Sequence, residues 1–116
     1  MKIAFDIDGT VMTQGSPEKD YRDAVALPEM VSLVNQLHYS GHEIYFFTAR
    51  HFKHFKYTKE TLETAGFKFD GLIMNKPSCD LYVDDKGFRF ENKAQKEELL
   101  KLIDGLTNVK TDKFCW

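Results

Sequence analysis

The sequence predicts an α/β fold in which a parallel β-sheet is covered by helices on both faces. Short apolar segments alternate along the chain with longer segments whose apolar residues recur at helical spacing, an order typical of α/β domains. Three of the four short segments are uniformly apolar, as expected for strands that are buried on both faces. The 116 residues fit one domain, 1–116, with little room for a second.

The chain begins with a predicted strand and a predicted flap. Residues 2–5 form an apolar run that stops at Asp6, which indicates a buried strand followed by a polar turn. Residues 13–23 are polar and contain glycine, serine and proline in succession, which indicates a loop. We therefore expect a small flap at about residues 11–26.

A helix and a second strand follow the flap. Pro28 suits the first turn of a helix and Gly41 is a natural stop, so we expect the helix between them. Residues 44–47 are the second apolar run, which ends in a polar turn at Thr48. The residues that recur at helical spacing in the helix are Met30, Val31, Val34, Leu37 and His38.

The remaining predicted elements are shorter. Thr58 can cap a short helix that Gly66 closes. Residues 72–74 and 81–83 are the third and fourth predicted strands. Asn92 can cap a last helix, whose apolar positions are Ala94, Leu99, Leu100 and Ile103.

The composition argues against several partners and compartments. The net charge of −2 provides no overall attraction to nucleic acid or to an anionic membrane. The N-terminus has no signal-peptide hydrophobic region, and no apolar run approaches the length of a membrane span. Cys79 and Cys115 share no motif, which favours free thiols. We therefore expect a cytoplasmic protein that binds neither membranes nor nucleic acid.

Polar and charged residues follow every predicted strand. In open parallel sheets the ligand site lies beyond the carboxyl ends of the strands. Carboxylates gathered at that edge would repel one another, and a bound cation relieves the repulsion. Oxygen ligands that leave room for water suit Mg²⁺. The residues at the four strand ends are Asp6, Asp8, Thr48, Arg50, Asn75, Lys76, Asp84 and Asp85.

The same edge also carries groups that suit a phosphate. Gly9 and Thr10 follow in a tight turn whose backbone N–H groups can face an anion. Thr48 adds a hydroxyl donor, and Lys76 adds a compact positive charge. Each motif alone is ordinary, as a turn, a cap or a loop. Together they supply what phosphoryl transfer through an aspartyl-phosphate requires.

These motifs resemble those of the haloacid dehalogenase superfamily of phosphatases. The first motif of that family, a strand followed by Asp-x-Asp-Gly-Thr, matches residues 6–10 at every position. The second, a strand ending in Thr or Ser, matches residues 46–50, Phe-Phe-Thr-Ala-Arg. Lys76 matches the third motif, and residues 81–85 match the fourth, an apolar strand ending in paired acids.

The resemblance implies a role for each matched residue. Asp6 would attack phosphorus and bind Mg²⁺. Asp8 would protonate the leaving oxygen and then activate water, with its backbone carbonyl on the metal. Asp85 would be a direct metal ligand, with Asp84 close by. The residues that would bind phosphate or substrate are Gly9, Thr10, Thr48, Ala49, Arg50 and Lys76.

The resemblance also implies a Rossmann-like three-layer fold with a mostly parallel central sheet and no cap domain. Capless members resemble enzymes that act on macromolecules or that take a lid from a neighbouring subunit, so a homo-oligomer would supply the lid. The whole pattern is similar to very small phosphatases associated with capsular polysaccharide biosynthesis. That likeness implies a small phosphorylated substrate, such as a sugar phosphate.

Other interpretations stay open. A nucleotidase or polynucleotide end phosphatase would use aromatic residues such as Phe52 and Phe55 to stack bases. A non-catalytic binding or regulatory module would be expected to lose catalytic residues, and here all of them are present. A phosphotransferase shares the first half-reaction. The basic segment 50–56 either attracts an anionic substrate or is a solvated loop.

Overall fold

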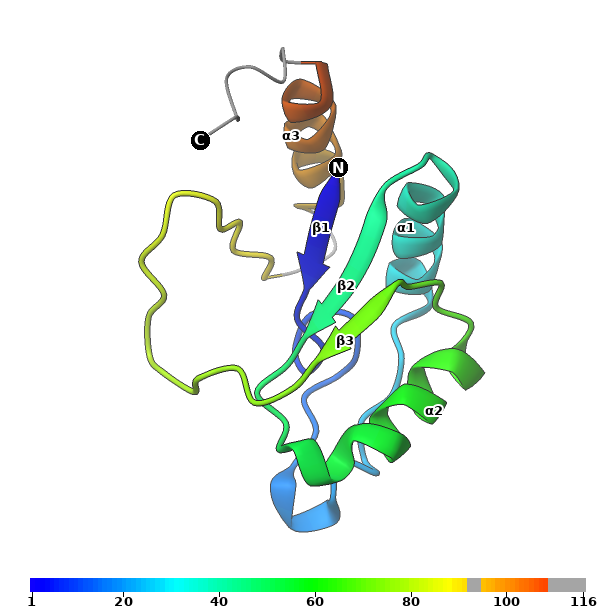
Figure 1. The fold of residues 1–116 in the computed structure, drawn as a ribbon, viewed down its shortest axis with the longest axis vertical. Coiled ribbons are helices and arrows are strands. Elements are labelled where there is room, and N and C mark those ends of the chain that lie inside the picture. The colour runs from blue at the N-terminus through cyan, green and yellow to red at the C-terminus, as the bar shows by residue number, and fades with distance from the viewer. Residues whose placement is uncertain (92–94, 109–116) are drawn as a thin grey trace.

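A three-stranded parallel β-sheet forms the centre of the protein, in a computed structural model that describes residues 1–91 and 95–108 (Figure 1). The strands are β1 (Lys2–Phe5), β2 (Glu43–Phe47) and β3 (Gly71–Ile73), in the order β1-β2-β3. Both pairings are parallel, with Phe5 opposite Phe46 and Phe46 opposite Leu72. The predicted α/β class with a parallel sheet is therefore confirmed.

Helices connect the strands in the order that the sequence predicts. Between β1 and β2 the chain forms a 3₁₀ turn, η1 (Pro17–Lys19), and a helix, α1 (Pro28–Tyr39). Between β2 and β3 it forms η2 (Phe52–His54) and α2 (Phe55–Ala65). The last helix is α3 (Lys96–Asn108). No helix within the described ranges is long and apolar enough to cross a membrane.

One apolar core joins the sheet to the three helices. Phe46 of β2 is fully buried, and the rings of Phe67 and Phe69 meet it edge-on, each 5.3 Å between centroids. Edge-to-face packing of this kind adds stability beyond the apolar area that is buried. The helical residues of this core are Met30, Leu33, Val34, Leu37, Leu62, Leu99 and Ile103.

The two faces of the sheet are buried to different extents. Ile44 and Phe46 lie on the buried face with Phe5. On the opposite face Ala4 is exposed, and Ile73 retains 50% of its surface. The expected cover over both faces is thus complete on one face and partial on the other.

The predicted strand at residues 81–83 is wrong for this structure. Figure 1 shows the chain after β3 swinging away from the sheet as a wide loop. Leu81 and Val83 are 70% and 89% exposed. The run is only three residues long, so it buries little by itself, and local bonds hold the loop instead. The Tyr82 hydroxyl donates to the Pro77 carbonyl, and Asp84 accepts from the backbone of the residues that follow it.

Helix boundaries agree with the sequence at some points and differ at others. Pro28 begins α1 as predicted, and Gly66 ends α2 with a φ of 95°, which glycine adopts without strain. The prediction that Thr58 caps α2 is wrong, because the helix begins at Phe55 and Thr58 is buried within it. The predicted cap and first apolar residue of α3, at positions 92 and 94, lie outside the described residues.

Candidate functional site

The carboxyl ends of the three strands bring most of the predicted site residues together. Asp6 and Asp8 follow β1, and Thr48 and Arg50 follow β2. Lys76 follows β3, and its backbone N–H donates to the Thr48 carbonyl at 2.8 Å. The segments after β2 and β3 are therefore bonded to each other beyond the sheet, which fixes the positions of the side chains between them.

The turn after β1 is a compact loop that uses its own backbone groups. The Ile7 carbonyl accepts from the N–H groups of Thr10, Val11 and Met12 at 3.1 Å each. Gly9 has a φ of 80° and donates to the Met12 carbonyl at 2.9 Å. The predicted tight turn is present, and it requires a glycine at this positive φ.

This turn changes which N–H groups are available to an anion. Gly9 and Thr10 were expected to offer theirs, but both N–H groups are bonded to carbonyls within the loop. The prediction that these two residues bind phosphate is therefore not supported. Within the described ranges, the N–H groups of Asp8 and Ala49 form no hydrogen bond, so they are among the donors left free near the strand ends.

Asp8 is held by a two-point ion pair with Arg50. The Arg50 Nε and Nη2 donate to the two Asp8 carboxylate oxygens, each at 2.8 Å. Arg50 Nη1 donates to the Thr58 hydroxyl at 3.1 Å. The side chains of Arg50 and Asp8 are only 1% and 12% exposed. A planar guanidinium matches a carboxylate in this way with defined geometry, which a lysine does not.

The predicted role of Arg50 is corrected by this arrangement. We expected it to bind substrate, but its guanidinium is buried and bonded to Asp8 and Thr58. Thr58 was not predicted as a site residue, although a buried threonine on a helix beside a buried arginine would have indicated a polar network. In this structure Arg50 therefore holds the Asp8 carboxylate, in place of the predicted exposed position for binding a substrate.

Asp6 is more accessible than Asp8 and faces a lysine. Its side chain is 38% exposed, and its Oδ2 lies 3.8 Å from the Lys76 Nζ. Burial is the main cause that raises the pKa of Asp6, and the neighbouring Asp8 carboxylate raises it further. The Ile7 N–H, Lys76 and Arg50 oppose that shift. Carboxylates that a substrate can reach act as covalent nucleophiles in enzymes that form an aspartyl-phosphate.

Thr48 links the two halves of this cluster. It is buried, and its hydroxyl accepts from the Arg50 N–H at 3.2 Å. The hydroxyl proton makes no hydrogen bond to another residue of the described ranges, so the hydroxyl keeps a donor, and its contact with a phosphate oxygen stays a prediction.

Asp84 and Asp85 do not join the other acids. Both are exposed on the loop that follows β3. Asp84 accepts from the N–H groups of Lys86 and Gly87 at 2.9 and 2.6 Å, and these bonds lower its pKa. The predicted placement of these acids beside Asp6 is wrong for this structure, because the strand that would carry them is not formed.

The donors for a magnesium ion are therefore incomplete. Nowhere in residues 1–91 and 95–108 do three His, Cys, Asp or Glu side chains gather as metal ligands. Asp6 and Asp8 are close to each other, but each carboxylate faces a cation, Lys76 or Arg50. In this arrangement the described residues do not form a complete Mg²⁺ site.

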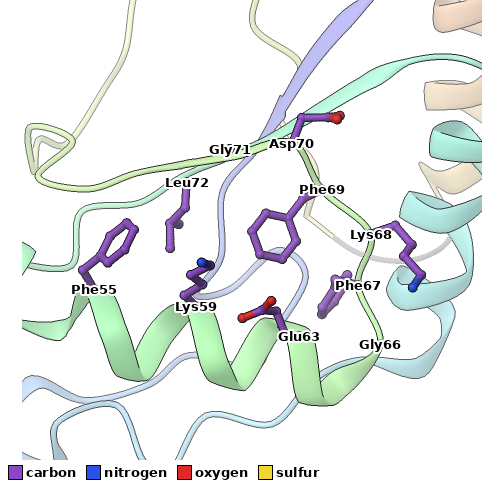
Figure 2. A pocket seen from close by; sticks show the side chains of 10 residues that line it. All are labelled: Phe55, Lys59, Glu63, Gly66, Phe67, Lys68, Phe69, Asp70, Gly71 and Leu72. Carbon is purple, nitrogen blue, oxygen red and sulfur yellow. The ribbon is translucent and has the colours of Figure 1, made fainter.

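Two hollows lie outside this cluster. One, of about 480 Å³, lies between α2 and the segment that leads into β3. Figure 2 shows Phe55, Lys59 and Leu72 among the side chains that line it. The other, of about 320 Å³, is lined by the flap and the start of α2. Neither contains a predicted catalytic residue, so we place the candidate site at the strand ends, where Asp6 and Asp8 lie.

Comparison with known proteins supports the fold and no more. No family model matches the chain, and no curated protein matches it. A solved crystal structure of a protein from Vibrio cholerae superposes with a TM-score of 0.64 at 22% sequence identity. The match covers 88% of this chain and 98% of that one. The chain therefore shares its α/β fold with that Vibrio cholerae protein.

Proposed function

We propose that the chain is a phosphomonoester hydrolase in which Asp6 is the nucleophile and Asp8 is the general acid–base. The observation that carries this proposal is the pairing of an accessible carboxylate with an oriented one. Asp6 is 38% exposed beside Lys76, whereas Asp8 is 12% exposed and fixed by Arg50. Two acids in different environments at one strand end suit two different roles in one reaction.

The proposed reaction balances over two steps. An Asp6 oxygen attacks phosphorus, the bond from phosphorus to the leaving oxygen breaks, and Asp8 gives its proton to that oxygen. Asp8 then takes a proton from water, which attacks the aspartyl-phosphate and releases inorganic phosphate with Asp6 restored. Lys76 and the free Ala49 N–H would bind the phosphoryl oxygens, on which negative charge is held.

Asp8 keeps room for a proton despite its bonds. A carboxylate has about four lone-pair positions. Arg50 takes two of them, and the Gly15 N–H takes a third at 3.3 Å. About one position is therefore left to exchange a proton with the leaving oxygen or with water.

The resemblance to haloacid dehalogenase phosphatases also suggests a substrate class. A haloacid dehalogenase-type phosphatase without a cap, similar to those of capsule biosynthesis, would act on a small phosphorylated metabolite such as a sugar phosphate. The same resemblance implies that phosphate release depends on Mg²⁺. In that family pattern Asp6, Asp8 and Asp85 would hold the ion, and here only the first two are close together.

A nucleotidase is the second candidate, and one feature favours it. The Phe52 ring is 62% exposed and lies nearly parallel to Phe55, with 5.6 Å between the ring centroids. An exposed ring close to a phosphate site can stack a nucleobase. A substrate preference for nucleotides that is lost in Phe52→Ala would support this candidate over the sugar phosphatase.

The test is phosphate release from a panel of sugar phosphates, nucleotides and small amino-alcohol phosphates. Each substrate is measured with Mg²⁺ and with EDTA, using the wild type, Asp6→Asn and Asp104→Asn. Asp104 is an exposed acid on α3, so its variant controls for the loss of one carboxylate far from the site. We expect release by the wild type and Asp104→Asn and none by Asp6→Asn. Equal release by all three proteins would contradict the proposal.

A further inference from the structure

Tyr21 connects the flap to the ion pair that holds Asp8. The Arg50 Cζ lies 4.4 Å from the centroid of the Tyr21 ring, within the range of a cation–π contact. The His54 ring meets the same tyrosine edge-on at 5.3 Å. The Tyr21 hydroxyl forms no hydrogen bond within the described part of the chain, so the ring alone makes these contacts.

The flap backbone is shaped to present this ring. Asp20 and Tyr21 both have left-handed backbone angles, with φ values of 53° and 62°. Such a conformation is strained for a bulky residue and persists only where the surroundings impose it. The Tyr21 N–H donates to the Ser16 carbonyl at 3.0 Å, and Ser16 is bonded twice to the Asp23 carboxylate.

Gly15 packs the flap directly against Asp8. Its N–H donates to Asp8 Oδ1 at 3.3 Å. A Cβ atom at this position would lie 3.0 Å from that same oxygen and 3.0 Å from Tyr21 Cδ1. The flap, Tyr21 and Asp8 therefore meet with no space for a larger residue between them.

We propose that Tyr21 is a positioning residue, through which the seated flap holds Arg50 against Asp8. The inference deepens the proposed function and rests on it for its effect on catalysis. The ring covers a face of a guanidinium whose side chain is only 1% exposed, which keeps water from competing for its N–H groups. Within the described residues, no other aromatic ring lies over Arg50 and could replace that of Tyr21.

The proposal separates catalysis from substrate binding. No hydrogen bond, ion pair or ring contact joins Tyr21 to Asp6 or Lys76, which would receive the phosphate. Loss of its ring should therefore lower kcat and leave KM unchanged. We expect a decrease in kcat of about tenfold in Tyr21→Ala, which corresponds to ~1.4 kcal/mol, within the range of partly desolvated cation–π contacts. Tyr21→Phe retains the ring and should retain kcat.

Tyr57 of α2 provides a matched control, because its ring contacts the same flap. Its ring lies 4.4 Å from the Arg22 Cζ, so it also joins the flap to α2 through a cation–π contact. No hydrogen bond, ion pair or ring contact joins its ring to Arg50 or Asp8. If Tyr21 merely anchored the flap, Tyr57→Ala would have the same effect on kcat as Tyr21→Ala. Under the proposal, Tyr57→Ala keeps the kcat of the wild type.

The Arg50 Nε–H signal in the NMR spectrum gives a readout that needs no activity. This proton is bonded to Asp8 in a buried site, so we expect slow exchange with water in the wild type. Exchange should accelerate at least tenfold in Tyr21→Ala and Tyr21→Leu, and stay slow in Tyr21→Phe and Tyr57→Ala. Tyr21→Leu keeps an apolar side chain in the flap and serves if Tyr21→Ala does not fold.

Each result decides between two accounts. Fast exchange confined to Tyr21→Ala and Tyr21→Leu supports the proposal, even if the wild type releases no phosphate and the hydrolase assignment fails. Slow exchange in every variant, or equally fast exchange in Tyr57→Ala, overturns it. An equal decrease of kcat in Tyr21→Ala and Tyr57→Ala would likewise reduce Tyr21 to a general anchor of the flap.

Discussion

Replacing Arg50 by lysine tests the polar network on which the candidate site depends. The wild-type side chain makes three hydrogen bonds, two to the Asp8 carboxylate and one to the Thr58 hydroxyl. Lysine keeps the positive charge but has one nitrogen in place of the planar fork, so it can keep about one of these bonds. Asp8 and Thr58 would be left partly unsatisfied in a site where water enters poorly.

The expected loss can be estimated bond by bond. A hydrogen bond that involves a charged group contributes about 1.5–3 kcal/mol to stability, and a neutral one about 1 kcal/mol. Since two of the three bonds to the charged guanidinium are lost, we expect the free energy of unfolding to fall by about 3–6 kcal/mol. Because the stability of a domain is typically about 5–15 kcal/mol, this loss is a large part of the total, and the variant should unfold at a clearly lower urea concentration.

Urea unfolding followed by circular dichroism at neutral pH measures this change. Arg89→Lys is the matched control, because Arg89 pairs with Glu91 at 2.7 Å in an exposed position. Exposed pairs contribute about 0–1 kcal/mol, so this variant should unfold close to the wild type. If Arg50→Lys and Arg89→Lys lose the same small amount, the buried ion pair does not stabilise the site as described.

Further predictions concern the nucleophile, its lysine and the sheet. Burial raises the pKa of Asp6 above 3.8 in the folded state, so folding favours the protonated side chain. Its contribution to the free energy of unfolding is therefore fully present below pH 3.8 and is lost as the pH rises through the raised pKa. Asp6→Asn cannot ionise, and its Tm by calorimetry should exceed that of the wild type at neutral pH, by a margin that vanishes below pH 3.8; a Tm margin that grows on acidification would contradict the assignment. Lys76→Gln should raise KM for a phosphate ester about tenfold or more in steady-state assays, since the charge that faces the phosphate is lost; an unchanged KM would remove this lysine from the site. Gly71→Ala should lower the free energy of unfolding by about 1–3 kcal/mol, because its Cβ would lie 2.6 Å from the Tyr45 ring, whereas Gly105→Ala meets nothing within 4 Å and should not destabilise.

Local signals in the sequence were sufficient for much of the fold. Pro28 and the apolar residues behind it predict α1, because proline and helical periodicity act within a few residues. The apolar runs before Asp6 and Thr48 likewise predict β1 and β2. The run at 81–83 has the same local pattern but no bonded partner, and a strand requires one.

The contacts within the site depend on tertiary structure and were not predicted. Asp8 and Arg50 are 42 positions apart, and no spacing rule joins them. Thr58 resembled a helix cap in sequence, since hydroxyl residues favour that position, whereas the fold uses its hydroxyl as an acceptor for Arg50. The N–H groups of Gly9 and Thr10 were assigned to an anion because the sequence does not show which carbonyls the turn folds back to meet.

The central claim is that Asp6 carries the phosphoryl group during turnover. The most direct measurement is to quench the protein with acid during turnover of its best substrate, digest it, and locate the phosphoryl group by mass spectrometry. We expect the phosphoryl group on the peptide that contains Asp6 in the wild type, and on no peptide in Asp6→Asn. Steady release of phosphate with no phosphoryl group on Asp6, or with the phosphoryl group on another residue such as His51, would contradict the account.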